Sequence, residues 1–280
     1  MHLVILILVL ISPVSTAGAN SDKKEDLSFS NTQKWSSGII HLVKTWKPIW
    51  VSFSKQEAQI INNMSPPPGN ESNQMSREID TLLQLQVVRS KHEMTEIKEE
   101  VVVCGWDMAG YLMGMNKALD DFLVDIFFDV TTAGYKLKRD FDRVRPSYYD
   151  KRITPSISVP KHPAYPSNHS IQTHVLALNL ADIFPEKRTE LLKSAFRITK
   201  NREIAGVHYE SDSEMGRKIA KTLHQKLSQN SNYQQTVNKL KRKYNNNKDI
   251  FSSFSKKNKR QCKAFIGEFR QAAGLNIRKD

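Results

Sequence analysis

Five prolines crowd one stretch of the chain and limit what that stretch can fold into. They stand at Pro146, Pro155, Pro160, Pro163 and Pro166. Proline has no backbone N–H, and its ring disrupts helix interiors and the middle of sheets. The stretch is therefore predicted to be a long irregular connection between two groups of regular elements.

On both sides of this connection, apolar residues recur at helical spacing, whereas the alternation typical of strands is scarce. We therefore predict an all-α fold, built as a single-domain helical bundle. The expected helices cover residues 78–100, 108–128, 131–143, 167–183, 187–200 and 208–228.

The first residues are typical of a targeting signal. Residues 3–11 form an apolar run of nine residues, and Ala-Gly-Ala at 17–19 matches a small-x-small cleavage site. The run is too short to cross a bilayer, which needs about 20 apolar residues. We expect cleavage near Ala19 and a periplasmic or secreted protein. The alternative is an uncleaved anchor, because His2 is the only basic group before the run.

The segment Ser-Pro-Pro-Pro-Gly-Asn, at residues 65–70, is typical of a rigid extended connector. Before it, Trp35, Trp46 and Trp50 recur at helical spacing. This pattern predicts a helix that packs on the core or, alternatively, a helix that lies at a membrane interface. The chain is thus divided into a signal peptide (1–19), an N-terminal helical extension (20–64), the main domain (65–228) and a basic C-terminal tail (229–280).

Positive charge is concentrated in the tail. The whole chain carries 42 Lys and Arg against 29 Asp and Glu, a net charge of +13. Residues 229–280 hold 13 basic and 3 acidic residues, which is +10 of that total. Such a tail attracts polyanions such as an acidic membrane surface. The alternative is a solvated, partly helical surface whose aromatic residues dock on the domain.

The chain has two cysteines, Cys104 and Cys262. An oxidising compartment permits a disulfide between them, which would tie the tail to the domain. Two free buried thiols are the alternative.

Three short motifs carry the candidate chemistry. In the first, Lys138 and Arg145 are seven residues apart, so they share one helical face and can clamp a tetrahedral oxyanion. In the second, Pro166-Ser167 precedes a predicted helix, whose free N–H groups suit phosphate. His169 follows in the first turn of that helix.

The third motif places Arg202 six residues before His208 and Asp212 four residues after it. At this spacing the carboxylate faces the imidazole on one helix and fixes its tautomer, which leaves the other nitrogen as a nucleophile or base. Each motif is common by itself. Together they supply cations and helix amides for an oxyanion, one histidine to attack and one to protonate, which is a complete set for phosphoryl transfer.

These motifs resemble the three-part signature of the type 2 phosphatidic acid phosphatase superfamily. Within it, the chain is most similar to the secreted class A bacterial non-specific acid phosphatases. The resemblance runs from about Pro66 to Lys243 and includes Ile-Phe-Pro at 183–185 and Gly-Val-His-Tyr at 206–209. It implies a helical bundle of the phosphatidic acid phosphatase/haloperoxidase type and metal-independent phosphomonoester hydrolysis without a cofactor.

The resemblance also implies roles for individual residues. His208 would attack phosphorus and form a phosphohistidine, and Asp212 would orient it. His169 would protonate the leaving alkoxide and then activate water, which predicts a mildly acidic optimum. The phosphate would be bound by Lys138, Arg145, Ser167, Asn168 and Arg202.

Two positions depart from the family pattern. The family usually has Gly where Asn168 stands and Ser where Asn201 stands. Asn tolerates left-handed backbone better than most residues, so the turn before the helix can survive. Its side chain would either narrow the site or donate an extra hydrogen bond. Because neither residue is one of the proposed proton-transfer groups, we expect the enzyme to keep its activity, with altered properties.

Two alternative functions are a vanadium-dependent haloperoxidase, whose family shares the anion pocket, and a non-catalytic polyanion-binding protein. A metal site built on His162 and His174 is disfavoured, because no carboxylate or Cys stands at ligand spacing beside them. The expected partners are phosphorylated small molecules, together with an acidic membrane surface or lipid phosphate reached through the Trp-rich segment and the tail. No specific nucleic acid is expected.

Overall fold

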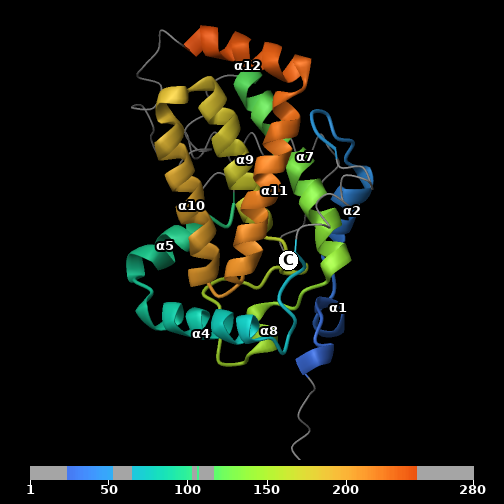
Figure 1. The fold of residues 1–280 in the computed structure, drawn as a ribbon, viewed down its shortest axis with the longest axis vertical. Helices are drawn as coiled ribbons and strands as arrows, with labels where there is room; N and C mark the ends of the chain where they lie inside the picture. Colours follow the sequence, from blue (N-terminus) through green and yellow to red (C-terminus); the bar gives the residue numbers. More distant parts are fainter. Residues whose placement is uncertain (1–23, 53–64, 103–105, 107–116, 245–280) are drawn as a thin grey trace, which may run out of the picture.

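The computed structural model describes residues 24–52, 65–102, 106 and 117–244. Every regular element among them is a helix, so the all-α prediction is confirmed. Helices α7, α9, α10 and α11 run side by side as a bundle, α4 lies across one end, and α12 crosses the other (Figure 1). The bounds are α4 Asn73–Val88, α7 Lys117–Phe141, α9 Asn168–Ile183, α10 Arg188–Ile204, α11 Glu210–Ser228 and α12 Ser231–Tyr244.

Helix α9 is the centre of the bundle and packs against α7, α10, α11 and α12. Only His169, Leu178 and Asp182 along its length are not fully buried. A helix that is buried on all sides belongs to the core. Its first residues, Ser167 and Asn168, are therefore buried too, and its free N–H groups lie inside the protein rather than at the surface.

Two predicted helix boundaries were wrong. The expected break between residues 128 and 131 does not exist, because α7 runs through it. The hydroxyl groups of Thr131 and Thr132 donate to the carbonyls of Phe127 and Phe128 within the same helix, at 2.6 and 3.0 Å. These bonds let a pair of β-branched residues stand in mid-helix.

The helix expected over 78–100 is instead two helices, α4 and α5 (Lys91–Glu99). Ser90 begins α5 with a capping box, in which its hydroxyl accepts from the Glu93 N–H and the Glu93 carboxylate accepts from the Ser90 N–H. This motif is a helix start signal that can be read from sequence. The connection predicted from the five prolines is irregular, with one short helix, α8 (Pro146–Tyr149), at its start.

The N-terminal extension contains η1 (Lys24–Asp26), α1 (Phe29–Thr32) and α2 (Ser37–Thr45). Its tryptophans face the protein. The ring of Trp46 packs on Phe128, and its indole N–H donates to Asp129 at 2.8 Å. Trp50 packs edge-on against Phe122. The sequence left two interpretations of this segment, packing on the core or lying at a membrane interface. The structure supports packing on the core.

The helical body continues beyond residue 228, where the basic tail was expected to begin. Helix α12 follows α11 directly and buries Tyr233, Val237, Leu240 and Tyr244, whereas the short helix η3 (Pro185–Lys187) lies between α9 and α10. The Tyr244 ring lies 5.6 Å from the ring of Phe184. The basic residues of α12, such as Lys241, are exposed.

Several expectations fall outside the described residues. These are the signal peptide, Cys104, Cys262 and the tail from residue 245 onward. In the part of the chain that the structure describes, no helix has the length and apolar character needed to cross a membrane.

Candidate active site

The structure brings the three motifs together. The pKa of His208 lies well below its usual value, first because the ring is buried and then because of Arg145, Lys138, His169 and Arg202. Ionisable groups from the end of α7 and the residues after it, from the start of α9 and from the end of α10 therefore act on one imidazole. The irregular connection makes this possible, since it returns the chain from α7 to the buried start of α9.

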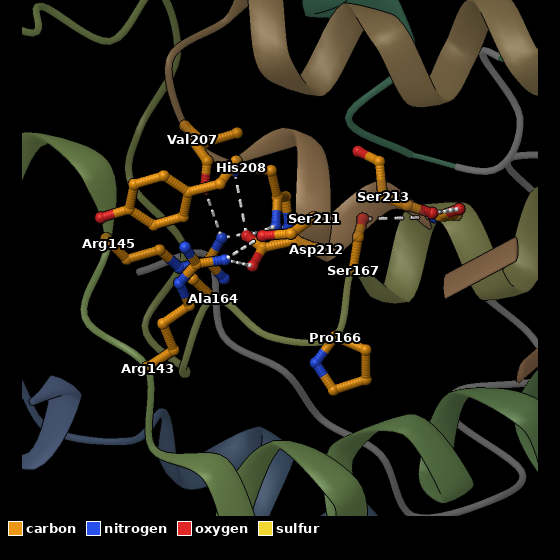
Figure 2. Close-up of polar contacts among 12 residues, drawn as sticks. Arg143, Arg145, Ala164, Pro166, Ser167, Val207, His208, Ser211, Asp212 and Ser213 are labelled. Carbon is orange, nitrogen blue, oxygen red and sulfur yellow. Dashed lines mark hydrogen bonds and ion pairs between the residues drawn. The ribbon is translucent and has the colours of Figure 1, made fainter. Parts of the chain in front are cut away.

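His208 and Asp212 form the expected pair at the start of α11 (Figure 2). Nδ1 of His208 lies 2.9 Å from Oδ2 of Asp212, and the Tyr209 N–H donates to the same oxygen at 3.0 Å. Because the carboxylate only accepts, the imidazole proton is on Nδ1. Nε2 is then the unprotonated nitrogen, and it faces Nη1 of Arg145 at 3.1 Å.

Two charged residues of the network around Asp212 were missed in the sequence. Arg143 donates through Nη1 to Oδ1 of Asp212 at 2.6 Å and through Nη2 to Glu78 at 2.8 Å. Its guanidinium lies over the Tyr209 ring, 3.8 Å from the centroid. Arg143 stands beside a recognised motif and could have been noticed there, but Glu78 comes from α4, and no local pattern connects it to the site.

Arg145 is fully buried and is held by His162. Its Nε donates to the His162 carbonyl at 2.9 Å, and its Nη2 lies 2.9 Å from Nδ1 of the His162 ring. A third bond runs from Nη1 to the carbonyl of Val207 at 2.7 Å. Burial lowers the pKa of Arg145 to about 10, so it stays charged. The His162 ring thus helps to hold the guanidinium of Arg145 in place.

Lys138 is buried in the same region, and its ammonium group is surrounded by main-chain carbonyls. Nζ donates to Pro163 at 2.7 Å, to Ala164 at 2.8 Å and to Pro166. Three bonds use all three donors of an ammonium group. Lys138 therefore orders the loop before α9, and it acts on the site through its charge.

The start of α9 is capped by Ser167, whose hydroxyl accepts from the Ser170 N–H at 3.3 Å. The Asn168 side chain does not narrow the site. It turns into the interface with α7, where Nδ2 donates to the carbonyl of Thr131 at 3.2 Å. Its Oδ1 occupies the space that a Cβ at Gly134 would need. The glycine of α7 thus makes room for the asparagine of α9.

His169 follows in the first turn of α9. Its Nε2 lies 3.3 Å from the carbonyl of Glu100, and its ring is 5.6 Å from the Trp106 ring. Burial, followed by the charge of Arg202, lowers the pKa of His169 to about 3. The imidazole is therefore neutral near neutral pH.

Arg202 has open hydrogen-bonding capacity. Its side chain is buried, and Nη2 donates to the carbonyl of Ile97 at 3.1 Å and to Glu100 at 3.4 Å. Nε and Nη1 have no hydrogen-bond partner among the described residues. Burial lowers the pKa of Arg202 to about 10, so the group stays charged. A buried cation with two free donors beside two histidines is suited to bind an oxyanion.

Comparison with known proteins gives a consistent result. No family model matches the chain. A Salmonella typhimurium protein named non-specific acid phosphatase is 26% identical over 131 residues, which are 44% of this chain and 52% of that protein. Proteins of the same name from Salmonella typhi and Providencia stuartii are 28% identical over 92 residues and 32% identical over 81 residues. These matches cover 33% and 29% of this chain and 37% and 33% of the relatives.

The chain thus spans about half, or less, of the length of the curated relatives it matches. Among solved structures, a bacterial vanadium-dependent chloroperoxidase aligns with a TM-score of 0.55 at 10% identity, over 73% of this chain and 56% of that one. At this identity the likeness concerns the fold. The predicted resemblance to non-specific acid phosphatases and the predicted bundle type are both confirmed.

Proposed function

We propose that this protein is an exported acid phosphatase that hydrolyses phosphomonoesters without a metal ion, through a phosphohistidine on His208. The observation that carries the proposal is the geometry of His208. Its Nδ1 is bonded to Asp212, while its unprotonated Nε2 faces the guanidinium of Arg145. The relatives named acid phosphatase support the same reaction class. The leader-like residues 1–19 support export.

The phosphate group would bind where the free donors and the positive charges meet. Arg202 offers Nε and Nη1, which have no partner among the described residues. Arg145 and Lys138 add two buried charges. The N-terminus of α9 adds the N–H groups of Asn168 and His169 and the positive end of a helix dipole. This set balances a dianion and stabilises the charge that spreads over the phosphoryl oxygens during transfer.

In the first step, Nε2 of His208 attacks phosphorus, and the bond from phosphorus to the ester oxygen breaks. His169, in its protonated form, gives its proton to the departing oxygen. Asp212 accepts the hydrogen bond from Nδ1 throughout and stabilises the positive charge that develops on the ring of His208.

In the second step, the now neutral His169 takes a proton from water, and the resulting oxygen attacks the phosphorus of the phosphohistidine. The bond from phosphorus to nitrogen breaks, inorganic phosphate leaves, and His208 returns to its neutral form. The low pKa of His208 supports both steps, because a ring that loses its proton readily is a free nucleophile before attack and a good leaving group afterwards.

His169 sets the direction of the pH dependence. Burial and Arg202 hold its pKa at about 3 without ligand. A phosphate dianion bound beside it raises that pKa, since an opposite charge favours the protonated ring. The general acid must be protonated for the first step. Activity is therefore expected to fall as the pH rises through the pKa of His169 in the complex, which gives an acidic optimum.

The test is hydrolysis of a chromogenic aryl phosphate between about pH 4 and 8, in the presence of EDTA. We expect turnover by the wild-type chain and a loss of at least about 10³-fold in His208→Asn, because the nucleophile is removed. Enzyme quenched with alkali and denaturant should carry a phosphate group that is stable to base and labile to acid. Turnover that disappears with EDTA, or that survives in His208→Asn, would contradict the proposal.

The shared fold supports a second candidate, a vanadium-dependent haloperoxidase. Vanadate has the charge and shape of a phosphoryl group, and the free donors of Arg202 would fit it equally well. In such an enzyme the vanadate supplies the peroxide chemistry. Halide oxidation by the protein loaded with vanadate, together with no phosphatase activity in its absence, would favour this function over the first.

A further inference from the structure

Glu100 lies at the end of α5 and is 2% exposed. Its carboxylate accepts hydrogen bonds from three side chains of α10. Arg197 donates to Oε1 at 2.7 Å, and Asn201 donates to Oε2 at 2.8 Å. Arg202 reaches the same Oε2 at 3.4 Å. The side chain of Glu100 therefore ties the end of α5 to the last two turns of α10.

The main-chain carbonyl of Glu100 contacts a different part of the site. It accepts from the indole N–H of Trp106 at 2.9 Å and lies 3.3 Å from Nε2 of His169. One residue thus contacts Arg202, which has the free phosphate donors, and His169, which carries the catalytic proton.

These contacts determine how the two groups are presented. A guanidinium is planar, so holding Nη2 against Glu100 fixes the plane that contains Nε and Nη1. Those are the two nitrogens left without a partner in the described part of the chain. In His169, the carbonyl can only accept, so the neutral ring has its proton on Nε2. Nδ1 is then the nitrogen that gains and releases the catalytic proton.

We propose that Glu100 is a positioning residue, which aligns Arg202 for phosphate through its carboxylate and fixes the tautomer of His169 through its carbonyl. This inference rests on the proposed phosphatase function. It also explains Asn201, where the family usually has serine. The amide of Asn201 reaches the Glu100 carboxylate, and the side chain of a serine at that position is one bond shorter.

The chain offers a matched control. Glu96 stands one turn before Glu100 on α5 and also pairs with Arg197, at 2.9 Å. Its other described ion pair is with His92, far from the proposed chemistry. Glu96→Gln therefore removes a similar charge, on the same helix and from the same arginine, without touching Arg202 or His169.

The experiment measures the binding of inorganic phosphate to the full chain by calorimetry, alongside the kinetics of aryl phosphate hydrolysis. We expect Glu100→Gln to weaken phosphate binding about 10-fold, the usual cost of losing a hydrogen bond to a charged group. We expect Glu96→Gln to stay within about twofold of wild type. If Glu100 acted only as a nearby negative charge, its removal would tighten phosphate binding. Tighter or unchanged binding in Glu100→Gln would overturn the proposal.

The dependence of activity on pH gives a second measurement. A purely structural role of Glu100 would leave this dependence unchanged. Burial and the charge of Arg202 lower the pKa of His169, the Glu100 carbonyl raises it, and Arg145 and Lys138 lower it further. Loosening the end of α5 weakens the carbonyl contact, so the descending limb of the profile should move to lower pH in Glu100→Gln. An unmoved limb together with normal phosphate binding would show that Glu100 does not position these groups.

The two proposals fail in different ways. Absence of turnover in the wild-type chain would contradict the phosphatase function, but phosphate binding would still test Glu100. If circular dichroism shows that Glu100→Gln does not fold, Asn201→Ser takes its place. That variant keeps the carboxylate and shortens one donor, so weaker phosphate binding is expected again. Unchanged binding in Asn201→Ser would then overturn the inference.

Discussion

At the scale of single residues, the site depends on buried charges that restrain one another. Asp212 accepts from the His208 ring, from the Tyr209 N–H and from Arg143. Arg143 in turn is shared with Glu78. A carboxylate held from three directions cannot rotate away from the imidazole, so the tautomer of His208 is fixed before any substrate arrives.

Replacing Arg143 tests this network. Arg143→Met leaves the carboxylates of Glu78 and Asp212 buried without their cation, so we expect the free energy of unfolding to fall by about 3–5 kcal/mol. The variant should also lose activity, because Asp212 is no longer held. Urea unfolding and kinetics measure the two effects. Arg139→Met, at an exposed position near the end of α7, should change both by little. If the Arg143→Met variant were as stable as the wild type, the network would not restrain Asp212.

At the scale of helices, the site depends on how closely α7 approaches α9. Asn168 projects into α7, and it fits because position 134 has no side chain. The asparagine side chain at position 168 is thus accommodated by a glycine on the neighbouring helix. The backbone at the start of α9 can keep its place beside the proposed phosphate position.

A double-mutant cycle tests this pairing. In Gly134→Ala the new methyl group overlaps the Asn168 amide, so we expect a loss of about 1–3 kcal/mol from overpacking. In the Asn168→Gly background the same substitution should cost nothing, or should stabilise the helix by about 0.5–1 kcal/mol. Thermal or urea unfolding of the four proteins measures the coupling. Equal effects of Gly134→Ala in both backgrounds would rule the pairing out.

The same scale shows what the sequence could predict. The starts of α9 and α11 were predictable, because Pro-Ser before one and the His–Asp spacing in the other are local signals. The continuity of α7 was not, because Thr131 and Thr132 favour strands or helix ends unless their hydroxyls bond back to the preceding turn. Glu78 and Glu100 were not predictable either, since each reaches the site from a distant helix.

At the scale of the whole molecule, the bundle buries an unusual set of histidines. Burial is the largest cause of a lowered pKa for His162, His169, His174 and His208. Two of these values are about 3 and about 4, for His169 and His174. All four rings are therefore neutral in the folded protein at pH 6, whereas in the unfolded chain a histidine takes up a proton near pH 6.5.

This difference predicts that the protein without ligand becomes less stable on acidification. A folded pKa below the unfolded value gives stability that is complete above about pH 6.5 and is lost as the pH falls, by up to about 1.4 kcal/mol per pH unit for each group. Glu100 and Glu203 act in the opposite direction, because burial raises the pKa of each. Four histidines outweigh two carboxylates over the range from pH 6.5 to 4.5, so the melting temperature should fall across it.

Thermal unfolding at several pH values, with and without inorganic phosphate, measures this effect. Phosphate should recover part of the lost stability, because it binds the folded protein only and favours a protonated His169. His174 is a suitable control, since its ring bonds to the Ser170 carbonyl away from the proposed chemistry. His174→Asn should reduce the slope of stability against pH and leave the effect of phosphate intact. A melting temperature that stays constant or rises between pH 6.5 and 4.5 would mean that these rings are not held neutral. In that case, binding of the substrate would not offset a loss of stability at the acidic pH where the enzyme is proposed to work.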